Sequence, residues 1–124
     1  VIFDFAGREA AGKLWDFSLT DMIFLITDST LRNIISSKSI FTEILAEYPE
    51  MPIIVFANKQ DTPNSLDPSA ISKVMGSTSH PMVAIDISYR DDLLQVLVDA
   101  LTHYFEIEVP DLPVEQLLCL ESEA

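Results

Sequence analysis

The sequence predicts an α/β fold, a three-layer sandwich in which a mostly parallel sheet carries helices on both faces. Two short apolar runs, residues 22–26 and 52–57, are typical of strands buried in such a sheet. Each run is followed by a stretch with apolar residues at helical spacing, so strands and helices alternate along the chain. The second run ends in Asn-Lys-Gln-Asp at residues 58–61, at the strand end where open α/β sheets bind ligands.

The first half of the chain predicts strands separated by one long helix. Residues 1–3 are apolar and begin a strand, and Ser29 or Thr30 can cap the helix that follows the run at 22–26. Pro49 ends that helix and, with Pro52, opens the next strand. The expected buried face of the helix consists of Leu31, Ile34, Ile35, Phe41, Ile44, Leu45 and Tyr48.

The second half predicts a shorter helix, a last strand and a final helix. Asp67 caps a helix that begins at Pro68 and stops at Gly76. Residues 77–80 form a polar loop, and residues 82–88 form the last strand and its exit. The residues expected to face inward are Ile71, Val74 and Met75 on the shorter helix, and Leu93, Leu94, Leu97, Leu101, Tyr104 and Phe105 on the final one.

Composition limits the class of protein. The 124 residues, 48% of them hydrophobic, are enough for one domain with a sizeable core. The formal net charge of −13 argues against nucleic-acid binding, which needs Lys and Arg in excess. No apolar run approaches the ~20 residues of a transmembrane segment, and no signal peptide is recognisable. The single cysteine, Cys119, suits a reducing compartment, so we expect a cytoplasmic protein.

The motif at residues 58–61 has the chemistry of a guanine site. An ionised Asp61 offers two acceptor oxygens to the ring N–H and the exocyclic amine of guanine, whereas adenine presents an acceptor in place of that N–H. Lys59 can lay its four-carbon stem along the ring face, and Asn58 can bridge the base and neighbouring backbone. The alternative is a polar strand-to-helix turn, because Asn and Asp are common in turns and caps.

A second motif upstream favours the guanine site. Asp-Phe-Ala-Gly at residues 4–7 closes the first apolar run, Trp15 follows eleven residues after the aspartate, and Thr-Asp-Ser-Thr at 27–30 closes the next strand. This order and spacing resembles the Arf and Arf-like small GTPases over roughly residues 1–105. The resemblance implies a guanine nucleotide, GTP or GDP, as ligand and Mg²⁺ as cofactor.

The resemblance also implies roles for individual residues. Asp4 would hold Mg²⁺ through a water molecule, and the Gly7 backbone amide would meet the γ-phosphate. Residues 8–18 correspond to switch II, a segment that reorders with the γ-phosphate and through which protein effectors or regulators would bind. Ile87 and Ser88 fall on the last-strand element whose backbone amide reaches the guanine oxygen, although the larger Ile87 could crowd the base.

Three departures qualify this expectation. Arg8 stands where the family usually carries the glutamine that orients the attacking water, so we expect impaired hydrolysis. No Gly-x-x-x-x-Gly-Lys-Ser/Thr phosphate loop occurs in the sequence. The family's first strand, which lies in the middle of the sheet, is also unaccounted for. We therefore interpret residues 1–105 as the C-terminal two-thirds of a small GTPase-like domain, followed by an acidic tail with a short helix at 106–124.

Three functions remain open. The favoured one is a GTP/GDP switch with impaired hydrolysis. The second is a pseudo-GTPase that binds guanine nucleotide with little hydrolysis, which Arg8 and the altered Ile87–Ser88 element favour. The third is a structural subunit that binds no nucleotide, although it leaves the joint presence of Asn58, Lys59 and Asp61 unexplained. No transmembrane segment is expected, while a peripheral membrane association stays open.

Overall fold

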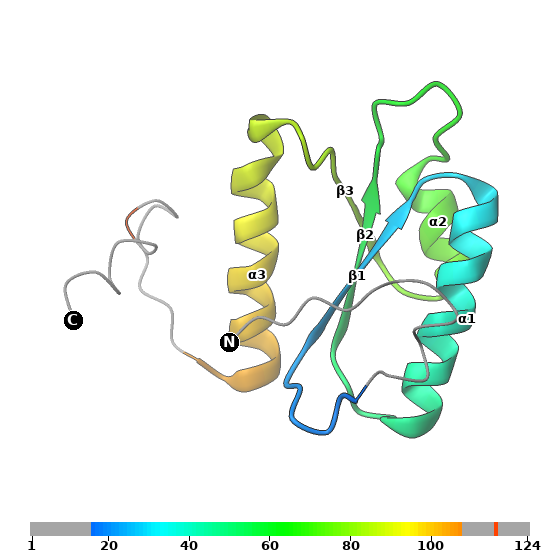
Figure 1. Cartoon of the computed structure of the whole chain (residues 1–124). Coiled ribbons are helices and arrows are strands. Elements are labelled where there is room, and N and C mark those ends of the chain that lie inside the picture. Colours follow the sequence, from blue (N-terminus) through cyan, green and yellow to red (C-terminus); the bar gives the residue numbers. More distant parts are fainter. Residues whose placement is uncertain (1–15, 108–115, 117–124) are drawn as a thin grey trace.

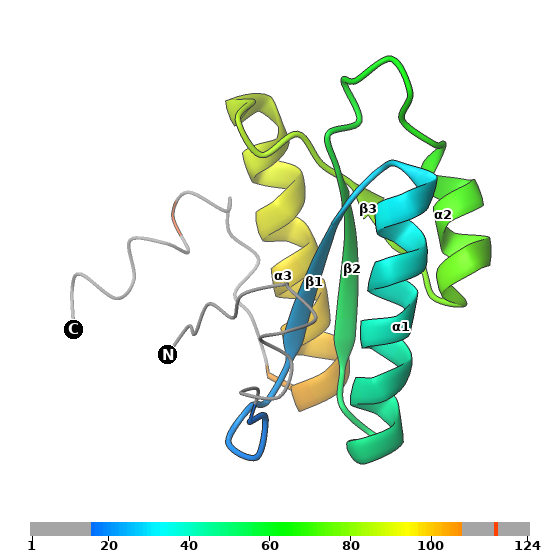
Figure 2. The ribbon, with the colours of Figure 1, turned by 45° about the vertical axis from the view of Figure 1, so that its right-hand side comes forward.

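A three-stranded parallel sheet forms the middle layer of the protein (Figure 1). The computed structural model describes residues 16–107 and residue 116. The strands lie in the order β1-β2-β3, with bounds Ile23–Asp28, Ile53–Asn58 and Ser79–Pro81. The helices are α1 (Leu31–Glu47), α2 (Pro68–Met75) and α3 (Arg90–Phe105), with a short 3-10 helix, η2, at Ile87–Tyr89. Helices α1 and α2 cover one face and α3 the other (Figure 2), which confirms the three-layer α/β prediction.

Strand β2 is the centre of the core, as its apolar sequence predicts. Its residues Ile53, Val55 and Ala57 pack in the cluster formed with α1 and α2, and Ile54 and Phe56 pack in the cluster under α3. All five are buried, because alternate side chains of a strand point to opposite faces and both faces carry a helix. The prediction of a strand buried on both faces is confirmed for β2.

Strand β1 departs from the prediction of a second fully buried strand. It runs over Ile23–Asp28, later than the expected 22–26, and its side chains toward α3 stay accessible: Phe24 is 37% exposed and Ile26 is 53% exposed. On the other face Thr27 is buried and Leu25 packs against the α1 cluster. The cause is the position of β1 in the sheet, because β2 is its one strand neighbour among the described residues.

Helix α1 begins and packs largely as expected. Thr30 is the N-cap, and its hydroxyl oxygen accepts a hydrogen bond from the Asn33 backbone N–H at 3.4 Å. Ile34, Phe41 and Ile44 are buried, but the prediction was wrong for Leu31 and Ile35, which are 56% and 58% exposed. These two residues are one turn apart on the flank that the described elements leave uncovered.

Helix α2 also follows its local signals. Asp67 caps it, Pro68 opens it and Gly76 ends it in the left-handed conformation with φ 73°. The Asp67 side chain accepts from the Ser69 backbone N–H at 2.8 Å, which lowers the pKa of Asp67. The inward residues Ile71 and Met75 are fully buried, whereas Val74 is 39% exposed and its predicted burial was wrong.

The last strand lies earlier than predicted. Strand β3 covers Ser79–Pro81, part of which was expected to be loop, and the predicted strand at 82–88 is a turn followed by η2. Ser79 is held by two residues of α2: its N–H donates to Ser72 Oγ at 2.9 Å and its Oγ donates to the Pro68 carbonyl at 2.8 Å. After Met82, whose N–H donates to the Ala57 carbonyl, the chain leaves the sheet.

Helix α3 packs through a narrower stripe than expected. Ala100 is buried, and Leu93 and Val96 pack with it against Ile54, Phe56 and Met82. Of the predicted apolar face, Leu94, Leu97, Leu101 and Phe105 are half-buried and Tyr104 is 47% exposed, so the predicted burial of Tyr104 was wrong. Within residues 16–107, no helix combines the length and apolar character needed to cross a membrane. Most of the acidic tail at 106–124 lies outside the described residues.

Candidate functional site

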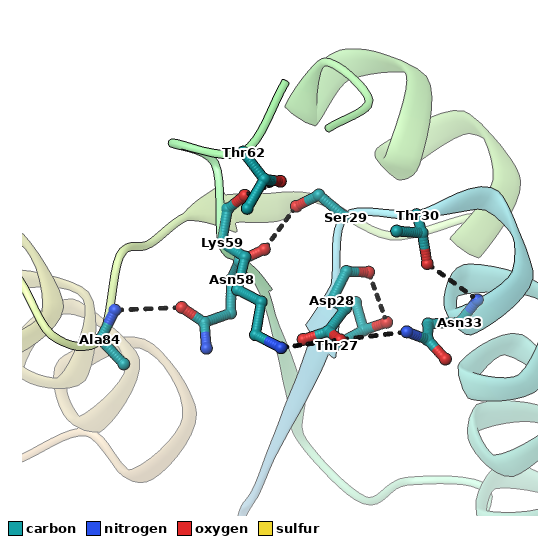
Figure 3. Close-up of polar contacts among 9 residues, drawn as sticks. All are labelled: Thr27, Asp28, Ser29, Thr30, Asn33, Asn58, Lys59, Thr62 and Ala84. Atoms are coloured by element: carbon teal, nitrogen blue, oxygen red, sulfur yellow. Dashed lines mark hydrogen bonds and ion pairs between the residues drawn. The ribbon is translucent and has the colours of Figure 1, made fainter. Parts of the chain in front are cut away.

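The candidate site lies where the carboxyl ends of β1 and β2 meet at one edge of the sheet. The parallel register pairs Asp28 with Asn58, so the segment after β1 and the Asn-Lys-Gln-Asp motif after β2 start side by side. Figure 3 shows the polar side chains that gather at this edge, from both strands and from the start of α1. Open α/β sheets bind their ligands beyond the carboxyl ends of their strands.

Ser29 joins the two segments from the inside. Its side chain is 1% exposed, and its Oγ donates a hydrogen bond to the Asn58 carbonyl at 2.6 Å (Figure 3). The same oxygen accepts from Gln60 Nε2 at 2.5 Å, and Gln60 Nε2 also donates to the Leu66 carbonyl at 3.1 Å. The buried hydroxyl therefore both donates and accepts a hydrogen bond, and these two bonds fix the Asn-Lys-Gln-Asp motif to the end of β1.

Asn58 connects the motif to the segment after β3. Its Oδ1 accepts a hydrogen bond from the Ala84 backbone N–H at 3.0 Å (Figure 3). In addition, the Gln60 backbone N–H donates to the Met82 carbonyl at 3.3 Å. The motif is thus held on two sides, by Ser29 and by the turn that follows β3.

Lys59 reaches across the strand ends. Its ammonium Nζ lies 3.2 Å from Asp28 Oδ2, and Asn33 Nδ2 donates to that same oxygen at 3.1 Å. The side chain of Lys59 is 58% exposed and that of Asp28 is 33% exposed, so solvent reaches the pair. Sequence reasoning missed the partnership of Asp28 and Asn33 with Lys59, although Thr-Asp-Ser-Thr at 27–30 had marked the end of the strand.

Asp61 presents an unused carboxylate at this edge. It lies in the turn after Lys59 and is exposed, and within the described part of the chain it makes no hydrogen bond or ion pair. The turn itself is closed by Thr62, whose N–H and Oγ1 both bond to the Lys59 carbonyl, at 3.2 and 2.8 Å. A carboxylate in this position can accept two hydrogen bonds from a ligand without losing a partner in the protein.

Ile87 and Ser88 lie in η2, which follows the turn after β3. The Ile87 side chain is 85% exposed. The N–H and Oγ of Ser88 both donate to Asp86 Oδ1, at 2.9 and 2.8 Å, and the backbone hydrogen bond holds the pKa of Asp86 below its ordinary value. The Ser88 N–H is therefore already used inside the protein, and neighbouring backbone must supply any contact to a ligand.

The remaining predicted site residues, Asp4, Gly7 and Arg8, lie outside the described residues, as does most of the segment 8–18. Within the described part of the chain, no group of three or more His, Cys, Asp or Glu side chains could hold a metal ion. The described structure therefore contains the base-binding candidates Asn58, Lys59 and Asp61 and leaves the predicted phosphate and Mg²⁺ contacts untested.

Comparisons with known proteins give the same family over most of the chain. Residues 1–98 match the profile of the ADP-ribosylation factor (Arf) family. The chain is similar to ADP-ribosylation factor-like protein 5 of Caenorhabditis elegans, with 32% identity over 81 residues. That match covers 61% of this chain and 46% of the relative, so the chain spans about half the length of the curated relative it matches.

Proposed function

We propose that this chain, which belongs to the ADP-ribosylation factor family, supplies the guanine-binding part of a GTP/GDP switch with slow hydrolysis. The observation that carries this proposal is the state of Asp61. Its carboxylate is exposed and makes no hydrogen bond within the described residues, while the motif around it is fixed by Ser29 and Ala84. Within the described residues this carboxylate is thus free to accept hydrogen bonds from a ligand, in a frame that is already fixed.

The base would be recognised by three side chains. Asp61 accepts from the ring N–H and the exocyclic amine of guanine, which adenine cannot offer together. The stem of Lys59 covers one face of the ring. Asn58, already bonded to Ala84, keeps its amide NH₂ for the base or for backbone on the phosphate side.

The phosphates require residues beyond the described ones. Gly7 would meet the γ-phosphate, and Asp4 would hold Mg²⁺ through a water molecule. The bound Mg²⁺ would neutralise charge on the phosphates. The phosphate loop itself would come from a longer parent protein, in which these 124 residues follow a phosphate-binding segment. The edge of β1 that no described strand pairs with supports this, because Phe24 is 37% and Ile26 is 53% exposed and side chains of an added strand would pack beside them.

The switch would work through residues 8–18. GTP would order this segment through Asp4 and Gly7, hydrolysis would release it, and protein effectors or regulators would bind the ordered form. The protein would act in the cytoplasm, where a peripheral association with membranes stays open. Arg8 makes hydrolysis slow, since a guanidinium has no acceptor with which to orient the attacking water.

A second function keeps its own support. Arg8, together with Ile87 and Ser88 in place of the family's smaller last-strand element, favours a pseudo-GTPase that binds nucleotide with little hydrolysis. The two functions differ only in turnover, so nucleotide binding comes first in any test.

The test is the base preference of the Asp61→Asn variant of the parent protein. Asparagine keeps the shape but places a donor opposite one of the guanine donors, and an opposed buried polar group costs about 1–3 kcal/mol. We expect GDP to bind at least about tenfold more weakly and xanthosine diphosphate, whose extra carbonyl accepts, to gain. The matched control is Asp99→Asn, which removes the same charge from the exposed face of α3. Unchanged GDP affinity in Asp61→Asn would make Asp61 a turn residue only.

A further inference from the structure

Asp28 and Asn33 hold the end of the Lys59 side chain in a defined place. Asp28 Oδ2 lies 3.2 Å from Lys59 Nζ and 3.1 Å from Asn33 Nδ2, which donates to it (Figure 3). Asp28 is the last residue of β1 and Asn33 lies in the first turn of α1, so the anchor comes from elements that precede the motif in the chain. The anchor therefore ties Lys59 to a neighbouring strand of the sheet.

The other end of Lys59 is fixed as well. Its backbone has φ 60°, a left-handed conformation that is uncommon outside glycine and persists where surrounding contacts maintain it. Thr62 supplies those contacts, with its N–H and Oγ1 both bonded to the Lys59 carbonyl. With both ends fixed, the four-carbon stem spans the gap between the ends of β2 and β1 (Figure 3).

Stability alone does not account for this arrangement. An ion pair this exposed contributes little to folding, and fixing a long lysine side chain opposes it through lost rotamer freedom. The contact has a clear value for a ligand, however, because a side chain already in place does not have to be ordered when the ligand binds.

We propose that Asp28, supported by Asn33, is a positioning residue for the guanine site. It acts on the base through Lys59, by anchoring the ammonium so that the stem forms a surface on which the purine ring lies. This inference rests on the proposed function and adds a residue to the base site from the neighbouring strand.

The direction in which Asp28→Asn changes the affinity for GDP separates this positioning role from simple electrostatics. The chain carries a formal net charge of −13, so removing any carboxylate near the nucleotide should favour binding of the anionic phosphates. Loss of the Lys59 anchor should do the opposite and weaken binding. Asp28→Asn therefore has opposite expected outcomes under the two explanations.

The experiment measures GDP affinity of the parent protein by calorimetry for wild type, Asp28→Asn, Asp28→Ala, Lys59→Met and the double variant Asp28→Asn/Lys59→Met. Methionine keeps an apolar stem and removes the ammonium. We expect Asp28→Asn to weaken GDP about two- to fivefold, the range of an exposed ion pair, and Asp28→Ala to weaken it at least as much. In the Lys59→Met background the same substitution should weaken GDP binding no further, and the lost negative charge can raise the affinity slightly, since the anchor is already gone.

Controls keep the result interpretable. Asp99→Asn should bind GDP as tightly as wild type or slightly more tightly, and thermal unfolding without nucleotide should be unchanged in Asp28→Asn. The inference is overturned if Asp28→Asn binds GDP as well as wild type, or if its loss persists in the Lys59→Met background. A parent protein that binds no GDP refutes the proposed function together with this inference. GDP binding with the Asp61→Asn base switch, but without an Asp28 effect, refutes this inference alone.

Discussion

Replacing Ser29 with alanine should destabilise the protein, because one buried hydroxyl serves both strand ends. Ser29 Oγ donates to the Asn58 carbonyl and accepts from Gln60 Nε2, and at 1% exposure water cannot replace it. Each hydrogen bond contributes about 1 kcal/mol net, and the Asn58 carbonyl would be left without this donor. Gln60 keeps its bond to the Leu66 carbonyl, which limits the loss on its side. The expected decrease in the free energy of unfolding is about 2 kcal/mol, within a range of about 1–3 kcal/mol.

Urea unfolding of the parent protein without nucleotide measures this loss. At a slope of about 2 kcal/mol per molar urea, the midpoint should fall by about 1 M with the slope unchanged. The matched control is Ser39→Ala, which removes a hydroxyl from the exposed side of α1 and should stay within about 0.5 kcal/mol of wild type. If the two alanine variants unfold at the same midpoint, the reasoning that Ser29 joins the strand ends is refuted.

Two further predictions concern turnover and acid stability. In single-turnover assays of the parent protein, Arg8→Gln should hydrolyse GTP faster than wild type and faster than Arg8→Ala. The reason is that glutamine can both accept a hydrogen bond from the attacking water and donate one to the phosphate. Equal rates for wild type and Arg8→Gln would contradict this prediction. Asp67 and Asp86 have pKa values lowered from 3.8 by the backbone N–H groups of Ser69 and Ser88. Because the folded pKa lies below the unfolded one, their contribution is present above about pH 4 and is lost as the pH falls through the folded value. Asp67→Asn and Asp86→Asn should each make the urea midpoint less dependent on pH below about pH 4, and an unchanged dependence would show that these caps do not matter for acid stability.

The fold elements that the sequence predicted well are those with local signals. Strand β2 is apolar throughout, so its burial on both faces does not depend on which neighbours cover it. Helix α2 carries its start and stop in its own residues, Asp67 with Pro68 at one end and Gly76 at the other. In both cases the local preference and the tertiary environment agree.

The elements that were predicted poorly depend on contacts with other elements of the fold. Strand β3 begins at Ser79 because Ser72 and the Pro68 carbonyl on α2 bind it there, and no local pattern in residues 77–80 indicates a strand. Leu31 and Ile35 fit the helical period of α1 but stay exposed, since periodicity identifies a face of the helix and not what covers it.

The site shows the same division. The chemistry of Asn58, Lys59 and Asp61 could be inferred from the motif, because guanine recognition needs those functional groups in a short stretch. The contributions of Asp28, Ser29 and Asn33 could not, because they follow from the parallel register that places Asp28 beside Asn58. A small polar residue directly after a buried strand, as Ser29 is, was the available signal, and it indicated only a helix cap.

The position of Lys59 argues that the motif was not shaped by folding alone. Glycine would adopt φ 60° freely, whereas a residue with a side chain meets a steric cost of about 1–2 kcal/mol in this conformation. Among the described residues the Lys59 ammonium bonds to Asp28 Oδ2, and Asn33 Nδ2 also donates to that oxygen, so Asp28 keeps a partner without the ammonium. The exposed ion pair with Asp28 stabilises the fold by less than the left-handed backbone conformation of Lys59 destabilises it. A lysine at this position is therefore better explained by a ligand that uses its side chain than by the stability of the turn.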